Sequence, residues 1–476
     1  MHSPHDTTAP TPAAPSSSWW RDLTDALRGV PHDYTSGALG RAILLLAVPM
    51  VLEMSMESLF AVVDVFFVGR IGPTAVAAVG MTESLMIVIY TLAFGLSIGA
   101  TATVARRTGE QDPDGAARAA VQVLILGAGL SLVLGAGGAL FAPQLLALMG
   151  ASPEVIAEGT GYARVMLGGG ASVFLLFVIN ATFRGAGDPA VAMRVLMVAN
   201  SLNMVLDPLF IFGLGPVPAL GVTGAAVATT IGRTVGFLIA LRMLLRGSGH
   251  LRVARPHVRL EPATMLGILR LSTAGTFQTA IATMSWLGLI RVVASFGATA
   301  MAGYTFAIRL AIFAFMPAFG LGGAAATLVG QSLGAKKPDR AEQAVRVATK
   351  VDVAFMGTIG LVYWLFAEPI IGLFTQDAPA AALAATGLRI MAYGFPLFGA
   401  GMVLEQAFNG AGDTWTPTWI NLGVYWIIQI PLAWLLARPL GFGVPGVFVS
   451  VTIAYSVFVL VAWVLFRRGR WKLKHV

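Results

Sequence analysis

Three acidic residues, Glu53, Glu57 and Asp64, lie within an otherwise apolar stretch at residues 41–70. Their spacings of four and seven residues place all three side chains on one stripe of an α-helix. At roughly 1.5 Å per residue, this helix is long enough to cross a hydrocarbon core of about 30 Å. Because an ionisable residue near the bilayer centre costs on the order of 2.5–3.5 kcal/mol, we expect the stripe to face protein or a water-filled cavity.

A second set of oxygen-bearing residues falls at a matching depth in two later apolar stretches. Asp207 precedes the end of the stretch 192–213, and Asn203 lies one helical turn before it on the same face. Thr229 follows the start of the stretch 222–245. Together with Asp64, these groups suit an all-oxygen Na⁺ cage, and the two carboxyls equally suit a proton-carrying pair.

The composition indicates a polytopic membrane protein. Of 476 residues, 57% are hydrophobic and only 11% are charged, whereas soluble proteins carry about 25% charged residues. The net charge of +8 comes from basic residues between apolar stretches, which does not favour nucleic-acid binding. The chain has no cysteine and no Gly-Lys dipeptide, which excludes thiol chemistry and a P-loop for ATP. We find no catalytic constellation and expect no cofactor other than a coupling ion, H⁺ or Na⁺.

About twelve apolar stretches predict an all-α fold with twelve transmembrane helices. They are roughly 43–68, 76–104, 117–141, 161–181, 192–213, 222–245, 265–294, 300–329, 345–367, 385–408, 417–437 and 444–466. Most Lys and Arg residues fall on the side that holds both chain termini. The positive-inside rule therefore predicts cytoplasmic termini in a bacterial inner membrane.

The chain contains two similar halves, and residues of the second half align with those of the first at an offset of 225 residues. Leu46 aligns with Leu271 and Gly109 with Gly334, and FRGAGD (183–188) aligns with FNGAGD (408–413). Six spans per half predict two lobes related by a pseudo-two-fold along the membrane normal. The expected organisation is an N-terminal tail with an interfacial segment (1–40), a first lobe (41–245), a basic linker (246–262), a second lobe (263–466) and a basic tail (467–476).

The acidic residues do not follow the repeat. Asp64 aligns with Leu289 and Asp207 with Leu432, while the second half has Glu405 opposite Asn180. An ion site is therefore expected in the first half. Further candidates for a substrate or proton path are Glu53, Glu57, Asn180, Asn200, Gln278 and Glu405.

Several long segments resemble the multidrug and toxic compound extrusion (MATE) family, most closely its DinF-like bacterial branch. They read LAVPMVLEMSMESLFAVVDVFFVGRIG, FRGAGDP, NSLNMVLDPLFIFG, IRLAIFAFMPAFGLGGAAATLVGQSLGAKKPDRA and EQAFNGAGDTWTP. The resemblance covers residues 41–466 and implies a V-shaped pair of lobes that exports organic cations by Na⁺ or H⁺ antiport. It implies coupling roles for Asp64, Asn203, Asp207 and a hydroxyl of the sixth helix, which matches Thr229 or, because the preceding loop varies in length, Thr230. The acid that the eukaryotic branch carries in its seventh helix is absent, because span 7 has Gln278.

We therefore expect a secondary active multidrug efflux transporter and not an enzyme. Its expected partners are drug-like small molecules and the lipid bilayer, and we expect a monomer. The alternative is a flippase of lipid-linked oligosaccharide or another lipid-like substrate from the same superfamily. A membrane enzyme is disfavoured because the sequence shows no cluster of catalytic or metal-binding residues. A passive channel is disfavoured because a two-fold repeat with lobe-specific acids favours a carrier.

Overall fold

The computed structural model describes residues 19–213, 215–247, 249–474 and 476, and within them every regular element is a helix. Twelve described segments are long and apolar enough to cross a membrane, which confirms the predicted all-α fold and its twelve spans. Residues 1–18 of the predicted N-terminal tail lie outside the described residues. Part of the expected interfacial segment forms the helix α1 (Trp19–Arg28).

The first six spans form one lobe and the last six form the other. The first lobe contains α2 (Leu39–Gly69), α3 (Pro73–Gly109), α4 (Pro113–Leu140), α5 (Ala142–Leu148), α6 (Pro153–Gly168), α7 (Gly170–Ala186), α8 (Pro189–Phe212) and α9 (Val222–Arg246). The second contains α10 (Pro262–Ala294), α11 (Ala298–Gly334), α12 (Pro338–Gly372), α13 (Ala378–Ala411), α14 (Trp415–Asn421), η2 (Leu422–Gln429), α15 (Ile430–Ala437) and α16 (Val444–Arg467). Short 3₁₀ turns, η1 (Arg255–His257) and η3 (Arg470–Leu473), lie in the linker and the C-terminal tail.

Many of these helices begin at proline, which lacks the N–H that a helix start leaves unpaired. Examples are Pro73, Pro189, Pro262 and Pro338. The helices therefore start earlier than the apolar stretches from which the spans were predicted. The eleventh span differs most from the prediction, because its middle is the π-helix η2 and not continuous α-helix.

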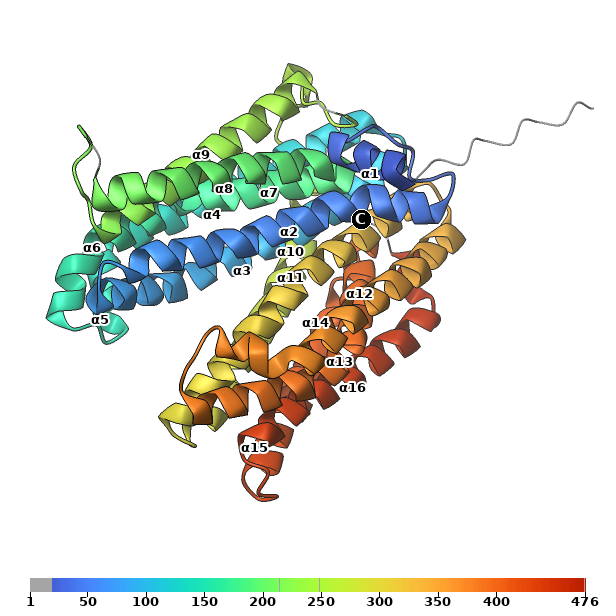
Figure 1. Ribbon diagram of the computed structural model, residues 1–476. Coiled ribbons are helices and arrows are strands. Elements are labelled where there is room, and N and C mark those ends of the chain that lie inside the picture. Colours follow the sequence, from blue (N-terminus) through green and yellow to red (C-terminus); the bar gives the residue numbers. More distant parts are fainter. Residues whose placement is uncertain (1–18, 214, 248, 475) are drawn as a thin grey trace, which may run out of the picture.

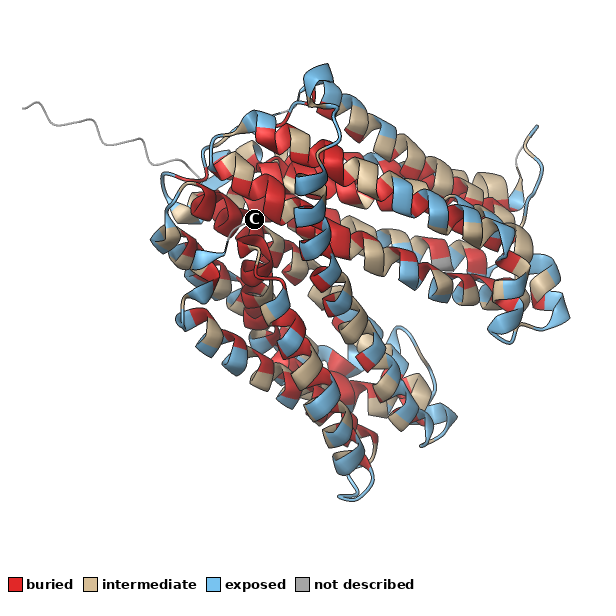
Figure 2. Cartoon of the chain, turned by 180° about the vertical axis from the view of Figure 1, so that it is seen from behind, coloured by how far each residue is buried: buried red, intermediate tan, exposed pale blue. Residues whose placement is uncertain are grey.

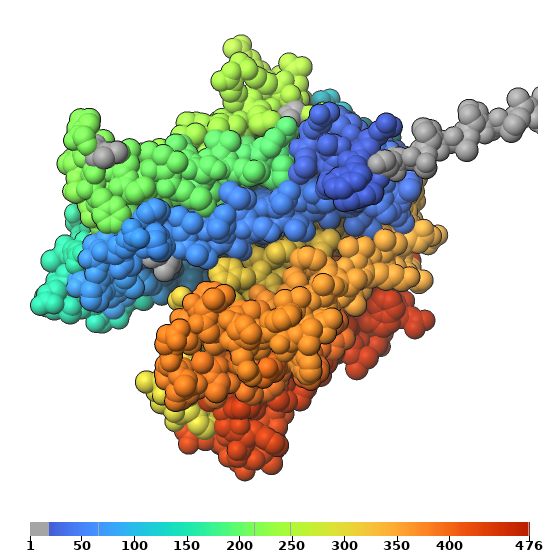
Figure 3. Space-filling model, in the orientation of Figure 1, coloured from blue at the N-terminus to red at the C-terminus, as the bar shows by residue number. Residues whose placement is uncertain are grey.

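The two lobes form a V (Figures 1 and 2). They meet near α1 and the C-terminal end of the chain, which we call the closed end, and diverge toward the opposite, open end. Buried residues concentrate where the lobes meet (Figure 2). In the space-filling view, the blue-green and orange-red halves separate toward the open end (Figure 3).

The contacts between the lobes follow the internal repeat, because equivalent residues of the two halves meet there. Across this seam, α3 packs against α10 and α11 packs against α2, while α3 and α11 cross each other. A Cβ atom on Gly109 would collide with the backbone of Gln331, and one on Gly334 would collide with the backbone of Arg106. Gly109 and Gly334 are repeat counterparts, and so are Arg106 and Gln331. Paired glycines therefore let the two lobes approach backbone to backbone.

Hydrogen bonds between the lobes seal the closed end. The Arg106 guanidinium donates to the carbonyls of Ala411 at 3.2 Å and Lys474 at 2.8 Å. From the other lobe, Gln331 Nε2 donates to the Gly185 carbonyl at 3.0 Å. The C-terminal tail thus forms part of the seal.

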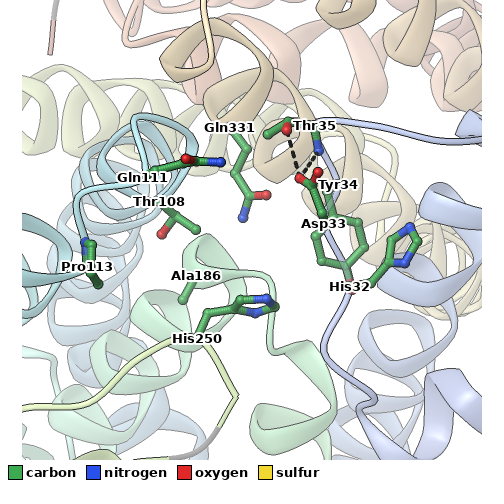
Figure 4. Close-up of a pocket in the computed structure, with 10 residues that line it drawn as sticks. All are labelled: His32, Asp33, Tyr34, Thr35, Thr108, Gln111, Pro113, Ala186, His250 and Gln331. Atoms are coloured by element: carbon green, nitrogen blue, oxygen red, sulfur yellow. Dashed lines mark hydrogen bonds between the residues drawn. The ribbon is translucent and has the colours of Figure 1, made fainter.

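The segment before α2 is also held between the lobes. Arg340 of α12 donates to the carbonyls of Tyr34, Ser36 and Gly37, at 3.0, 2.6 and 2.9 Å. Tyr34 is buried and lies beside Gly187 and Gln331. Figure 4 shows Tyr34 and Gln331 among the residues that line a cavity of about 370 Å³. Because this segment contacts both lobes, a change in the lobe angle has to move or release it.

Candidate functional site

Two of the three acids on α2 are neutralised by arginines of the same lobe. Arg184 Nη1 lies 2.6 Å from Glu53 Oε1, and Glu53 is buried. Arg233 of α9 donates to both oxygens of Glu57, at 2.6 and 3.1 Å. Asn200 Nδ2 adds a bond of 3.3 Å to Glu57. These partners give Glu53 and Glu57 a structural role in the lobe core.

Asp64 and Asp207 lack such partners. Asp64 is 8% exposed, and no described residue forms an ion pair or hydrogen bond with it. Asp207 is fully buried, and within the described part of the chain neither of its carboxylate oxygens has a hydrogen-bond partner. The two carboxylates are close enough to repel each other, and Glu83 adds further negative charge near Asp64. Such a pair favours a proton or a cation, because two adjacent buried carboxylates are costly when both are ionised.

Asn203 and Thr229 meet beside Asp207. Asn203 Nδ2 donates to Thr229 Oγ1 at 3.0 Å, and Asn203 Oδ1 remains without a partner. Gly232 permits this contact, because a side chain there would collide with the backbone of Ala199 on α8. The structure therefore brings three predicted residues together and leaves an amide oxygen free near the two acids.

A sodium ion at this position would be bound by only two charged ligands, the carboxylates of Asp64 and Asp207. The described residues contain no group of three or more His, Cys, Asp or Glu side chains suited to a metal ion. Two carboxylates with neutral amide and hydroxyl oxygens remain chemically suitable for Na⁺, as they are for a proton. The geometry does not favour one ion over the other.

Asn180 and Asn200, the other two candidates in the first lobe, support the acids of α2. Asn180 is buried beside Glu53, and its Oδ1 has no hydrogen-bond partner. Asn200 contacts Glu57, as described above. Neither side chain lies among the lining residues of a described cavity.

The sequence analysis overlooked several buried charged residues, among them Arg106 at the closed end, Arg233 and Asp352. Arg233 is 3% exposed, forms an ion pair with Glu57 and lies near enough to Asp64 to attract its charge. Its position four residues after Thr229, inside an apolar span, was an available signal. Asp352 of α12 is fully buried in the second lobe without a hydrogen-bond partner.

The second lobe contains a separate cavity of about 510 Å³ that faces the first lobe. Glu405 lines it together with Gln278, as the residue types suggested, and with Asn421, which the sequence analysis did not single out. Gln278 Nε2 and Asn421 Nδ2 both donate to Glu405 Oε1, the second at 3.1 Å. The structure therefore separates the candidates into a first-lobe acid cluster and a second-lobe cavity.

The family model named MatE matches residues 49–209 and 276–435, which together exceed half of the chain. The chain belongs to the MatE family. The two matched ranges, one in each lobe, correspond to the internal repeat. Membership in this family of transporters agrees with the expectation that the chain is not an enzyme.

Relatives of this MatE chain resemble it over nearly their whole length. A Pseudomonas aeruginosa protein, "Probable multidrug resistance protein NorM", is 31% identical over 425 residues, which cover 86% of this chain and 85% of the relative. The Bacillus subtilis "Probable multidrug resistance protein YoeA" is 26% identical and covers 92% and 95%. A solved structure titled "Outward-facing conformation of a multidrug resistance MATE family transporter of the MOP superfamily" has a TM-score of 0.87 at 27% identity, covering 93% of this chain and 98% of that one.

Proposed function

We propose that this MatE chain is a secondary active multidrug efflux transporter. It exports organic cations and other amphipathic compounds in exchange for H⁺ or Na⁺, acting as a monomer. The observation that carries the proposal is the contrast on α2. Glu53 and Glu57 have arginine partners, whereas Asp64 and the facing Asp207 have none. The names of the relatives support the substrate class.

The orientation is part of the proposal. The linker and the C-terminal tail, RVARPHVR (252–259) and RRGRWKLK (467–474), are strongly basic and belong to the closed end. By the positive-inside rule, this end faces the cytoplasmic side of a bacterial inner membrane. The V then opens to the outside.

In this mechanism the lobes adopt an outward-open and an inward-open state, and binding of the ion lowers the affinity for drug. In the outward-open state, Asp64 and Asp207 take up H⁺ or Na⁺ from outside. The bound ion removes the repulsion between the carboxylates, so α2, α8 and α9 pack differently and the affinity for drug falls. The ion-loaded protein then turns inward and releases the ion. Only a difference in affinity between the two states drives this cycle.

The test is exchange in proteoliposomes that contain a fluorescent organic cation, with ΔpH and ΔNa⁺ imposed separately. We expect wild-type protein to respond to one of the two gradients and Asp64→Asn to respond to neither. The matched control is Glu368→Gln, because Glu368 is exposed and its one ion pair among the described residues is with Arg389, at 3.0 Å. The proposal is wrong if Asp64→Asn protein exchanges at the wild-type rate.

A further inference from the structure

The second lobe carries an apolar groove of about 550 Å³ between two of its membrane-spanning segments. One wall is formed by residues 416–428 of α14 and η2, and the other by residues 457–465 of α16. The two walls pack against each other within the second lobe (Figure 1). Trp419 and Ile427 of the first wall are 63% and 71% exposed, so the groove is open to the surface. Because both segments span the membrane, this surface faces lipid.

The groove is about as long as one leaflet of a bilayer is deep. It starts at the closed end, where α14 begins just after Ala411 and α16 ends before Lys474, two residues of the closed-end seal. At roughly 1.5 Å per residue, its two walls are about 18 and 12 Å long. Half of a hydrocarbon core is about 15 Å. The groove therefore lies beside the acyl chains of the leaflet nearest the closed end.

Gly423 leaves space on the floor of the groove. It lines the groove, and nothing lies within 4 Å of a Cβ added to it. The next residue, Val424, also lines the groove and is only 3% exposed, so the floor beneath this space is packed. A hydrocarbon chain above Gly423 gains dispersion contacts with the apolar walls on both sides.

The end of the groove at the closed end is strongly basic. Residues 414–476 contain no Asp or Glu, and the segment RRGRWKLK (467–474) begins at the last residue of α16. Arg467 and Arg468 are exposed, and neither forms an ion pair with any described residue. Basic clusters directly after a transmembrane helix attract anionic lipids, at about 1 kcal/mol for each Lys or Arg, or about fivefold in affinity.

The spacing along α16 directs one of these arginines toward the groove. Val461 and Leu465 line it, and Arg468 follows three residues later on the same stripe. The helix continues through Arg468, whose backbone angles are −65° and −17°. On the facing wall, Trp419 presents an indole ring of the kind that is enriched at membrane interfaces.

The acid that precedes α14 does not oppose an anion at this place. Asp413 is 6% exposed, and Lys474 neutralises it at a distance of 3.1 Å. The hydroxyl of Thr416, at the end of the groove, also donates to Asp413, at 2.8 Å. The positive charge of Arg467 and Arg468 is therefore available to a ligand.

We propose that this groove binds a phospholipid with an anionic headgroup in the leaflet at the closed end. Arg468 binds the phosphate, Trp419 borders the glycerol region, and one acyl chain lies over Gly423. A zwitterionic lipid with the same chains carries its own positive charge and binds about fivefold more weakly. The inference is independent of the transport proposal, because it requires neither a coupling ion nor a drug.

The lipid contacts the same π-helix that borders the second-lobe cavity. Val424 and Ile427 of η2 line the groove, whereas Tyr425 and Gln429 line the cavity, and no described residue lines both. A lipid in the groove therefore supports η2 on the side away from the cavity. Because the lipid binds the folded second lobe, it should also raise the temperature of unfolding.

The test is native mass spectrometry of purified full-length protein in detergent, titrated with phosphatidylglycerol or with phosphatidylcholine of identical acyl chains. We expect one site that prefers phosphatidylglycerol by about fivefold. Phosphatidylglycerol with a diazirine on one acyl chain should label peptides from residues 416–428 and 457–465 after illumination.

Two variants separate the acyl chain from the headgroup. Gly423→Leu fills the groove and should abolish the site, and we expect it to fold because nothing lies close to the added side chain. Its matched control is Gly129→Leu on α4, where an exposed glycine also has nothing within 4 Å of an added Cβ. Arg468→Gln should remove most of the preference and leave phosphatidylcholine binding unchanged. Its control is Arg246→Gln at the end of α9 in the first lobe, which should keep the preference.

The outcomes decide whether the groove is a lipid site. Equal binding of the two lipids by wild-type protein overturns it, and so does a preference of wild-type size in Gly423→Leu or in Arg468→Gln. Dimers that Gly423→Leu abolishes, in the absence of a lipid preference, would assign the groove to a second copy of the chain and overturn the lipid site as well. Binding is measured without an ion gradient, so failure of the lipid site leaves the transport proposal unaffected.

Discussion

Arg233 donates one hydrogen bond to each carboxylate oxygen of Glu57, at 2.6 and 3.1 Å, inside the first lobe. The planar guanidinium matches the carboxylate in this two-pronged geometry, which a lysine cannot reproduce. The pair joins α9 to α2, the helix that also carries Asp64. The ion pair therefore fixes the orientation of the acid stripe relative to α8 and α9.

Removal of one partner of this pair should be strongly destabilising. Arg233→Ala leaves Glu57 without its counter-charge, and we expect a loss of about 3 kcal/mol in stability. The double variant Arg233→Ala/Glu57→Ala should lose less than the sum of the single variants. Thermal unfolding of the purified protein in one detergent provides the four values of the double-mutant cycle. Strict additivity would show that the pair contributes no coupling energy.

Asp207→Asn should separate function from stability. Asp207 is fully buried and has no hydrogen-bond partner, so an amide of the same shape removes a costly charge and the repulsion with Asp64. We expect the melting temperature to stay the same or rise, while gradient-driven exchange is lost. Thermal unfolding and proteoliposome exchange measure the two effects. A marked fall in melting temperature would assign Asp207 a structural role instead.

The linker at the closed end should detach as the pH rises. The His250 backbone N–H and ring both contact Asp188, at 2.8 and 3.3 Å, and this hydrogen bond raises the pKa of His250 above its ordinary 6.5, although burial opposes the rise. Asp33 and His32 are the other titratable groups facing it. The stabilisation is therefore complete below about pH 6.5 and is lost as the pH rises through the raised pKa.

Limited proteolysis or hydrogen exchange of residues 249–254 between about pH 6 and pH 9 measures this release. His250→Gln introduces a polar side chain of similar size that does not titrate. In this variant the rate of proteolysis or hydrogen exchange should no longer change with pH. The control matters because His257 of the same linker lies 3.1 Å from Asp114. An unchanged profile in His250→Gln would assign the pH dependence to another group.

The glycine pair at the seam should be intolerant of even a methyl group. A Cβ on Gly109 overlaps the backbone of Gln331, which cannot move as a flexible side chain would. We expect Gly109→Ala to cost about 1–3 kcal/mol, with a similar cost for Gly334→Ala. Gly80→Ala on the same helix α3 is the matched control, because nothing lies within 4 Å of its added Cβ. Thermal unfolding compares the three variants, and equal melting temperatures would contradict a tight seam.

The sequence was sufficient for the fold because its signals are long and redundant. Twelve apolar stretches and a repeat that keeps one offset predict spans and lobes without knowledge of any contact. The structure confirms this architecture. The spacing of Asp207, Asn203 and Thr229 likewise placed them at one level, since helical rise converts residue number into depth.

The sequence could not predict which acids are neutralised. Arg184 is 131 residues from Glu53, and Arg233 is 176 residues from Glu57. Such ion pairs depend on which helices pack against each other. Helical periodicity in the sequence carries no information about this packing. The π-helix is similarly invisible, because Leu422–Gln429 reads as an ordinary apolar span. Gln429, the last residue of this π-helix, was overlooked for this reason.

The divergence of the two halves has a consequence for how the molecule can be assembled. Asp64 corresponds to Leu289 in the other half, and Arg233 corresponds to the buried Phe458. A dimer of two first halves would have two acid clusters and no amide-lined cavity, and a dimer of two second halves would have the reverse. Halves expressed as separate polypeptides should therefore complement each other only as a heterodimer, with neither homodimer active.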